Sequence, residues 1–309
     1  MHDRIVCVVK DTSLEELRKR YPSRDQIRYI IESRGETFGK YEQEDKMDRH
    51  ARACMSDALP RDVPHVTINR DDVSRFMFRK NDFIVACGPD GLFVNVARYL
   101  EGQPVIGINP ESSRERVLMQ WDGRDDRRYL RQTIADLVCG KADSRACARP
   151  ISLGKATTND GQEVYAVNDF MIGRINHVSP RYHIDYGGIS QRQMSSGILV
   201  STGVGSSGWI HSIVRAAEDM TGGEFPLEVP FEWDAERLMF IVREPITRGR
   251  DAMVTFGEIT PDKPLTVTSE MAEGGVIFSD GVLEDSIDFR AGITATITVA
   301  ERKAYLICP

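Results

Sequence analysis

Three short polar segments, each beside an apolar run, hold the side chains best suited to chemistry. The first, residues 88–91, reads Gly-Pro-Asp-Gly and follows the apolar residues 83–87. A glycine-rich turn between a buried strand and a helix can present backbone N–H groups and the positive helix end to a phosphate. Asp90 adds one carboxylate. Pro89 has no N–H to donate, and aspartate is a common turn former, so a phosphate site and an ordinary turn both remain open.

The second segment is the pair Asn168-Asp169, which interrupts an apolar pattern over residues 164–175. Asparagine and aspartate are depleted in strands, and adjacent strand residues point to opposite faces. The pair therefore indicates either a bulge or strand end, or polar side chains placed at a binding site.

The third segment, residues 201–209, lies between a predicted strand and a predicted helix. Small residues allow a ligand to approach the backbone closely, and hydroxyl groups can bond phosphate, ribose or a base edge. Trp209 could stack on a base. The same pattern fits a helix cap followed by a core tryptophan. The candidate binding residues here are Thr202, Gly203, Gly205, Ser206, Ser207, Trp209 and, one helical turn on, Ser212.

The first half of the chain alternates apolar runs with helical patterns, which predicts a mainly parallel sheet covered by helices. In such sheets ligands bind at the carboxyl ends of the strands, and Asp90 and Asn109 both follow predicted strands. Strands are expected at residues 4–10, 66–68, 83–87 and 104–108, and helices at residues 25–33, 44–59, 92–100 and 127–138.

After Pro150 the pattern changes to short apolar runs separated by turns rich in Gly, Pro and Asp, which predicts an antiparallel sheet or sandwich. One helix is expected from Trp209. We therefore expect an α/β domain over residues 1–145 and a β-rich domain over residues 146–309, whose C-terminal tail can pack back on the first domain. The expected strands are residues 164–175, 182–186, 197–201, 238–242, 253–256, 265–268, 276–279, 293–299 and 304–307.

The charge, cysteine and histidine content disfavour several classes of function. The net charge is −7 and no long basic block occurs, which disfavours binding to nucleic acid or to anionic membranes. The apolar run at residues 5–9 is too short for a signal peptide or a membrane span. The six cysteines form no CxxC pair and the six histidines are scattered. These features predict a cytoplasmic protein with reduced cysteines and without a dedicated metal site.

Together the three segments resemble the NAD kinase family. That family has a Gly-Gly-Asp-Gly-Thr loop, an Asn-Glu pair, a Ser-Thr-Pro-Thr-Gly-Ser-Thr-Ala-Tyr stretch and an Asp-Gly turn. Their counterparts here, in the same order, are residues 88–92, 168–169, 201–209 and 280–281. The likeness is greatest to the divergent branch that includes mitochondrial NAD kinases, which share Ser-Ser-Gly at residues 195–197 and Val-Arg-Glu-Pro at residues 242–245.

The resemblance implies a two-domain fold with its site in the crevice between the domains. It also implies transfer of a phosphoryl group from ATP or polyphosphate to the adenosine ribose 2′-hydroxyl of NAD, in a homodimer or homotetramer. Asp90 would be the catalytic base, and Gly88 and Gly91 would let the loop approach phosphate. Asn168 and Asp169 would hold hydroxyl groups of the nicotinamide riboside. Ser207, Trp209 and Ser212 would line the nucleoside pocket. Mg²⁺ or Mn²⁺ would be held mainly by the donor phosphates.

The sequence departs from the family pattern at the phosphate loop, where Pro89 replaces glycine and Leu92 replaces threonine. Three functions therefore remain open: an NAD kinase, a nucleotide-binding relative with weak or no catalysis, and a related kinase acting on a sugar or lipid hydroxyl. The sequence leaves open the choice of ATP or polyphosphate, and of NAD or NADH.

Overall fold

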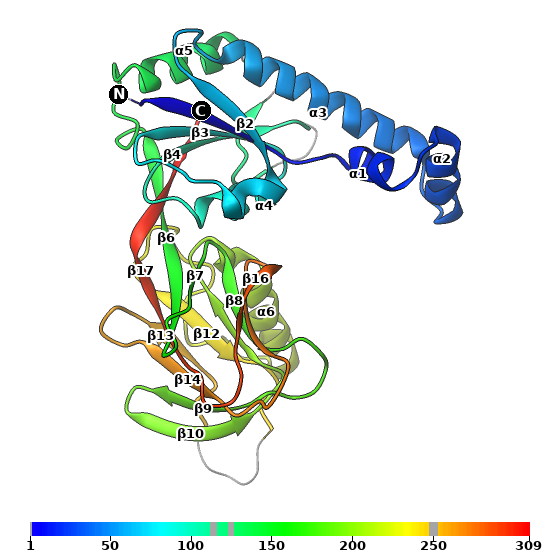
Figure 1. The fold of residues 1–309 in the computed structure, drawn as a ribbon. Coiled ribbons are helices and arrows are strands. Elements are labelled where there is room, and N and C mark those ends of the chain that lie inside the picture. Colours follow the sequence, from blue (N-terminus) through cyan, green and yellow to red (C-terminus); the bar gives the residue numbers. More distant parts are fainter. Residues whose placement is uncertain (1, 112–115, 123–126, 247–252) are drawn as a thin grey trace. The chain divides into compact units, whose positions relative to one another are not determined.

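The computed structural model describes residues 2–111, 116–122, 127–246 and 253–309, which form two units (Figure 1). Unit 1 comprises residues 1–149 and 305–309, and unit 2 comprises residues 150–304. The C-terminal residues thus belong with the N-terminal unit. Each unit has its own hydrophobic core.

Unit 1 is built on a parallel sheet with the strand order β2-β1-β3-β4, next to which the last residues of β17 pair with β4. The central strands are buried along their length because helices cover both faces, so they read as continuous apolar runs. The strands are β1 (Arg4–Val9), β2 (His65–Asn69), β3 (Asp82–Cys87), β4 (Pro104–Asn109) and β17 (Thr294–Ile307), and the two-residue β5 (Trp121–Asp122) also pairs with β4.

Alternate residues of this sheet face different helices. Cys7, Phe83 and Val85 share one cluster with apolar residues of α3 (Phe38–Ala58) and α5 (Arg127–Val138). The residues between them, such as Ile84, face the side on which α4 (Asp90–Ala97) lies. Figure 1 shows α4 on the face opposite α3 and α5.

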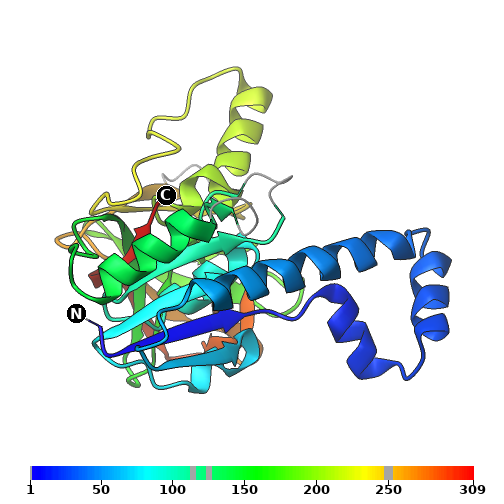
Figure 2. The ribbon, with the colours of Figure 1, turned by 90° about the horizontal axis from the view of Figure 1, so that it is seen from above.

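Two short helices pack on the outer end of α3, away from the sheet (Figure 2). They are α1 (Ser13–Arg20), which begins with a capping box between Thr12 and Glu15, and α2 (Arg24–Ser33), which is capped by Ser23. The contact is a small apolar cluster that includes Leu14, Ile27, Ile31 and Phe38.

Unit 2 contains two antiparallel layers with apolar side chains between them. The inner faces contribute residues such as Phe170, Phe240 and Ile277 from one layer and Tyr182, Val267 and Ile297 from the other. The first layer has the order β13 (Phe256–Ile259), β12 (Leu238–Val242), β11 (Ile198–Ser201), β8 (Asp169–Arg174), β15 (Gly275–Ser279) and β16 (Val282–Asp288). The second contains β10 (Ile189–Met194), β9 (Arg181–Tyr186), β14 (Leu265–Ser269), β17, β6 (Ala148–Thr158) and β7 (Glu163–Ala166).

The outer face of the first layer is covered by α6 (Trp209–Thr221), whose Ile210 and Val214 pack against Leu199, Met239 and Ile241. The predicted fold class is confirmed: an α/β unit with a mainly parallel sheet, followed by a β-rich, sandwich-like unit.

Several predicted elements are wrong in detail. The strand expected at residues 164–175 is divided into β7 and β8, and the two strands expected at 293–299 and 304–307 are one strand, β17. Residues 253–255 are not a strand; β13 begins at Phe256. The sequence analysis did not predict α1, β6, β10 or β16. α1 has a single buried residue, Leu14, and a highly charged sequence, so its apolar pattern is weak.

Candidate functional site

Asp90 is the first residue of α4, directly after the turn that ends β3. Its carboxylate accepts three backbone hydrogen bonds: Oδ2 from Val117 N at 3.0 Å, and Oδ1 from Leu118 N at 3.0 Å and from Met119 N at 2.9 Å. The side chain therefore holds residues 117–119, which precede β5. Gly88 is buried and donates its N–H to Ile108 O, whereas Gly91 is exposed at the first turn of the helix.

A pocket in unit 1, here called the strand-end pocket, opens beside this turn. It lies at the carboxyl ends of β1, β3 and β4, where parallel sheets bind ligands. The lining residues are polar and carry both signs of charge: Lys10, Asp11, Thr12, Ser13, Glu44, Met47, Asp48, Pro89, Pro110, Glu111 and Arg116.

Two lining residues of the strand-end pocket, Arg116 and Asp48, have buried charged groups. Arg116 has a buried Nε with no hydrogen-bond partner among the described residues. Asp48 is buried on α3 and forms an ion pair with Arg52, one helical turn along. Burial raises the pKa of Asp48 to about 7, although the charge of Arg52 opposes that shift. A guanidinium with an unused donor beside a pocket is suited to hold an anion.

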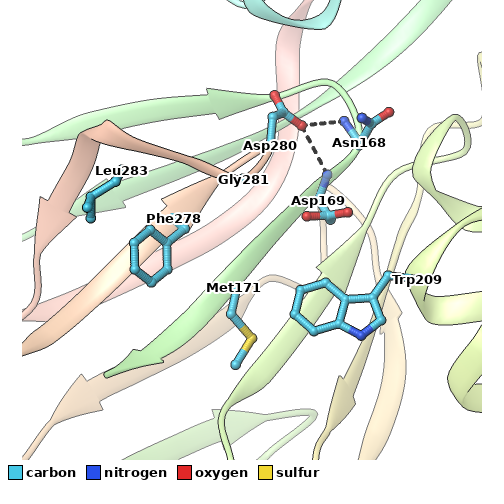
Figure 3. Close-up of a pocket in the computed structure, with 8 residues that line it drawn as sticks. All are labelled: Asn168, Asp169, Met171, Trp209, Phe278, Asp280, Gly281 and Leu283. Carbon is cyan, nitrogen blue, oxygen red and sulfur yellow. Dashed lines mark hydrogen bonds between the residues drawn. The ribbon is translucent and has the colours of Figure 1, made fainter. Parts of the chain in front are cut away.

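The second pocket, here called the Trp209 pocket, lies wholly in unit 2 and has a volume of about 520 Å³, within the usual range for small-molecule sites (Figure 3). Trp209 is 42% exposed, so it is a pocket wall and not a core residue. The Arg243 guanidinium lies 5.1 Å from the centre of its ring. The lining residues are Asn168, Asp169, Met171, Trp209, Phe278, Asp280, Gly281 and Leu283.

Two carboxylates, Asp169 and Asp280, lie at the end of this pocket where β8 begins. Burial and, to a lesser degree, the negative charge of Asp280 raise the pKa of Asp169 to about 7. Asp280 accepts hydrogen bonds from the backbone N–H groups of residues 167, 168 and 169. The pocket therefore combines an aromatic wall with a carboxyl group that changes charge near neutral pH.

The small residues before α6 are engaged within the protein. A Cβ atom on Gly203 would lie 2.0 Å from Glu232 O, and one on Gly205 would lie 2.1 Å from Asn168 O. The Thr202 hydroxyl donates to Val167 O, and the Ser206 hydroxyl donates to Gly203 O and accepts from Phe231 N. The small size of these residues is thus required by close packing of the chain on itself.

Neither Ser206 nor Ser207 caps α6, because its N-cap is Gly208 and no side chain bonds there. The cap that the sequence left open as an alternative is wrong. Ser207 and Ser212 are exposed, and their hydroxyls donate to Val204 O and Gly208 O.

Of the predicted binding residues in unit 2, Asn168, Asp169 and Trp209 line one pocket, and Thr202, Gly203, Gly205, Ser206, Ser207 and Ser212 are not among its lining residues. Sequence reasoning missed the polar lining of the strand-end pocket, notably Lys10, Asp48 and Arg116. Lys10 directly follows β1, and a polar residue at the carboxyl end of a strand can indicate a binding site. Asp48 lies in the middle of α3, where the sequence looks like that of an ordinary amphipathic helix.

Among the described residues, no group of three or more His, Cys, Asp or Glu side chains is arranged to hold a metal ion. No helix within the described ranges is long and apolar enough to cross a membrane.

No protein-family model and no curated protein matches the sequence. Solved structures do match. An NAD kinase from Archaeoglobus fulgidus, solved in complex with ATP, aligns with a TM-score of 0.55 and 17% identity, covering 98% of this chain and 93% of that one. A yeast NADH kinase complexed with NADH aligns with a TM-score of 0.56 and 13% identity, covering 100% of this chain and 84% of that one. At the level of the fold, the predicted resemblance is therefore confirmed: the chain has the two-domain fold of the NAD kinases.

Proposed function

We propose that the protein is an NAD kinase-like phosphotransferase, which transfers a phosphoryl group from ATP or polyphosphate to the adenosine ribose 2′-hydroxyl of NAD or NADH. The observation that carries this proposal is the meeting of Asn168, Asp169 and Trp209 in one pocket of suitable size. These residues were selected from sequence by their match to the family's motifs. The full-length structural match to an NAD kinase and an NADH kinase supports the same reaction class.

In the Trp209 pocket, the indole ring offers a face for stacking a base, and Met171, Phe278 and Leu283 add apolar contact. The Asn168 amide and the Asp169 carboxylate supply acceptors for ribose hydroxyls. Ser207 and Ser212 remain proposed substrate contacts because both are exposed. The other four residues are buried and support the loop: Thr202 and Ser206 donate their hydroxyls to backbone carbonyls, and Gly203 and Gly205 allow close packing.

The strand-end pocket is the proposed site of the donor phosphates. Arg116 and Lys10 are among its lining residues and supply two positive charges, and the buried Nε of Arg116 has no hydrogen-bond partner among the described residues. The turn with Gly88 and Gly91 lies beside it, and Pro89 is part of its wall. Pro89 contributes apolar surface and no donor, so the cationic side chains replace part of the backbone cradle expected from the family pattern.

Mg²⁺ or Mn²⁺ is the proposed metal cofactor. It would be held mainly by the donor phosphates and water, because Asp11, Asp48 and Glu111 line the strand-end pocket but are not arranged to hold a metal ion by themselves. When bound, the ion would neutralise charge on the donor phosphates. The side chains of Arg116 and Lys10 would bind and orient the same phosphates.

Asp90 is the proposed catalytic base. A carboxylate has about four acceptor positions, and three are occupied by the N–H groups of residues 117–119. One position remains for the acceptor hydroxyl. The 2′-oxygen forms the new bond to the terminal phosphorus, the bond to the nucleoside diphosphate breaks, and the hydroxyl proton passes to Asp90. The three N–H groups would hold the base in place during this step.

The second candidate function is a nucleotide-binding protein without efficient catalysis. It is favoured by the same three hydrogen bonds, because an aspartate that holds a loop has a structural reason to be present even where no proton is transferred.

The test is incubation of the protein with Mg²⁺, with ATP or polyphosphate, and with NAD or NADH, followed by chromatographic detection of NADP or NADPH. Formation of the product by the wild type and its loss in Asp90→Asn support the kinase. Tight NAD binding without product from any pair of substrates supports the binding protein. Homodimers or homotetramers, as in the proposed family, are expected by light scattering.

A further inference from the structure

The carboxylate of Asp280 holds the turn that carries the two polar residues of the Trp209 pocket. Oδ1 accepts from Asn168 N at 2.7 Å and from Asp169 N at 3.2 Å, and Oδ2 accepts from Val167 N at 3.0 Å. Figure 3 shows the bonds to Asn168 and Asp169, with the Asp169 side chain directed toward Trp209. Asp280 itself has a φ of +55°, in the left-handed region, so its own backbone adopts a conformation uncommon for a residue with a side chain.

The hydrogen bonds to Asp280 interrupt the strand between residues 166 and 169. The apolar pattern of residues 164–175 would continue as one strand, but the N–H groups of residues 167–169 point to one carboxylate and not to a neighbouring strand. β7 therefore ends at Ala166 and β8 begins at Asp169. The break places Asn168 and Asp169 together on the pocket wall, where a regular strand would point them to opposite faces.

Asp280 also disfavours the negative charge of the neighbouring Asp169. Asp169 is close enough to Asp280 for its ionised form to be disfavoured, and burial acts in the same direction. Among the lining residues, these two carboxyl groups are the titratable ones; the rest are apolar, glycine or the Asn168 amide. The guanidinium of Arg243 lies over the Trp209 ring and is 3.7 Å from the carboxylate of Glu244.

We propose that Asp280 is a positioning residue that couples binding of a nucleoside in the Trp209 pocket to release of a proton from Asp169. This proposal rests on the proposed function, because it takes the ligand to be a nucleoside with a free ribose diol. Two adjacent hydroxyl groups donate best to an ionised carboxylate, so the ligand binds the deprotonated form of Asp169 and the proton passes to solvent.

The expected size of the effect follows from the pKa of Asp169, which is about 7 in the free protein. If only the ionised form binds, the apparent dissociation constant equals the intrinsic constant divided by the fraction of Asp169 that is ionised. The affinity for NAD then falls about tenfold between pH 8 and pH 6, and about half a proton is released per ligand at pH 7.

The experiment is isothermal titration calorimetry of the full chain with NAD from pH 6 to pH 8, in two buffers with different ionisation enthalpies. The wild type should show both the loss of affinity and the proton release. Asp169→Asn should bind with little dependence on pH and release no proton. Asp280→Asn removes the neighbouring charge, so the midpoint of the pH profile should move to lower pH, and the rearranged turn should weaken binding at every pH.

Asp288→Asn is the matched control. Asp288 is an exposed aspartate at the end of β16 that pairs with Arg290, and its loss should leave the profile unchanged. A wild-type affinity that is constant from pH 6 to pH 8, or an unchanged midpoint in Asp280→Asn, would overturn the coupling while leaving the kinase proposal intact. Absence of any NAD binding by the wild type would overturn the proposed function and this inference together. If Asp280→Asn does not fold, the proton count of the wild type and of Asp169→Asn decides the question.

Discussion

The Asp90 carboxylate holds residues 117–119 by three hydrogen bonds and is also the proposed proton acceptor. Asp90→Asn keeps the shape of the side chain, removes the proton acceptor and leaves one oxygen for the loop. We expect kcat for NADP formation to fall at least about 10²-fold while the dissociation constant for NAD changes little, because a general base acts in the transition state. Steady-state kinetics and calorimetric binding measure both.

Asp143→Asn is the control for the Asp90 variant. Asp143 is an exposed aspartate of the same unit whose Oδ1 accepts from Arg145 N, so it tests the loss of a loop-holding carboxylate that has no proposed role in catalysis. If Asp90→Asn keeps its turnover, Asp90 is a structural residue and the binding-protein alternative gains support.

Trp209 is exposed beside Asp169, which predicts a contact with the base and little contribution to the core. Stacking on an aromatic ring contributes about 1–3 kcal/mol per base, so Trp209→Ala should weaken NAD binding by about tenfold or more. Trp209→Phe keeps an aromatic face and should retain most of the affinity. Both variants should melt near the wild-type temperature. An early melting transition with normal affinity would instead identify Trp209 as a packing residue.

At the scale of the elements, Gly205 in the loop before α6 and Gly91 in the first turn of α4 both belong to candidate motifs but have different surroundings. Gly205→Ala would place a Cβ atom 2.1 Å from Asn168 O, so the backbone must shift. We expect a loss of stability of about 1–3 kcal/mol. Gly91→Ala meets no atom within 4 Å and lies in the first turn of α4, where alanine is favoured, so stability should stay equal or rise by about 0.5–1 kcal/mol.

Urea denaturation measures both glycine variants. Since Gly91 is proposed to let the loop approach phosphate, Gly91→Ala should still raise the Michaelis constant for ATP despite its sound fold. An unaltered constant would show that Gly91 does not approach the donor, and equal stability of the two variants would contradict the packing argument.

Helices and strands whose apolar residues follow a regular spacing within a short window could be predicted from the sequence. β3, β4 and α5 are buried strands or a helix with one apolar face, and both kinds of pattern are visible in a short window. A strand end at Asn168-Asp169 was one of the two alternatives that the sequence left open, and the structure has a break there between β7 and β8. Its cause could not be predicted, because Asp280 lies 112 residues beyond Asn168 in the chain. Asn168, Asp169 and Trp209 could be selected by motif, but their meeting in one pocket depends on tertiary contacts.

At the scale of the whole molecule, two buried carboxyl groups among the described residues have a pKa raised to about 7: Asp48 in unit 1 and Asp169 in unit 2. In the unfolded chain both would titrate near the ordinary value of 3.8 given for aspartate. Between these two values the folded protein binds more protons than the unfolded chain. The contribution of these groups to the free energy of unfolding is therefore largest below about pH 4 and is lost as the pH rises through 7.

We expect Asp169→Asn to lessen this loss. The stability difference between the variant and the wild type should be smallest at pH 5 and should shift in favour of the variant by on the order of 1–3 kcal/mol by pH 8, since one pKa unit corresponds to about 1.4 kcal/mol and partial solvation reduces the full effect. Urea denaturation of both proteins at pH 5, 6, 7 and 8 measures the difference, with Asp288→Asn as the control. A difference that stays constant with pH would show that Asp169 ionises at its ordinary pH. A difference that grows as predicted would mean that the ionised carboxylate proposed to bind ribose destabilises the free fold, and that ligand binding offsets this cost.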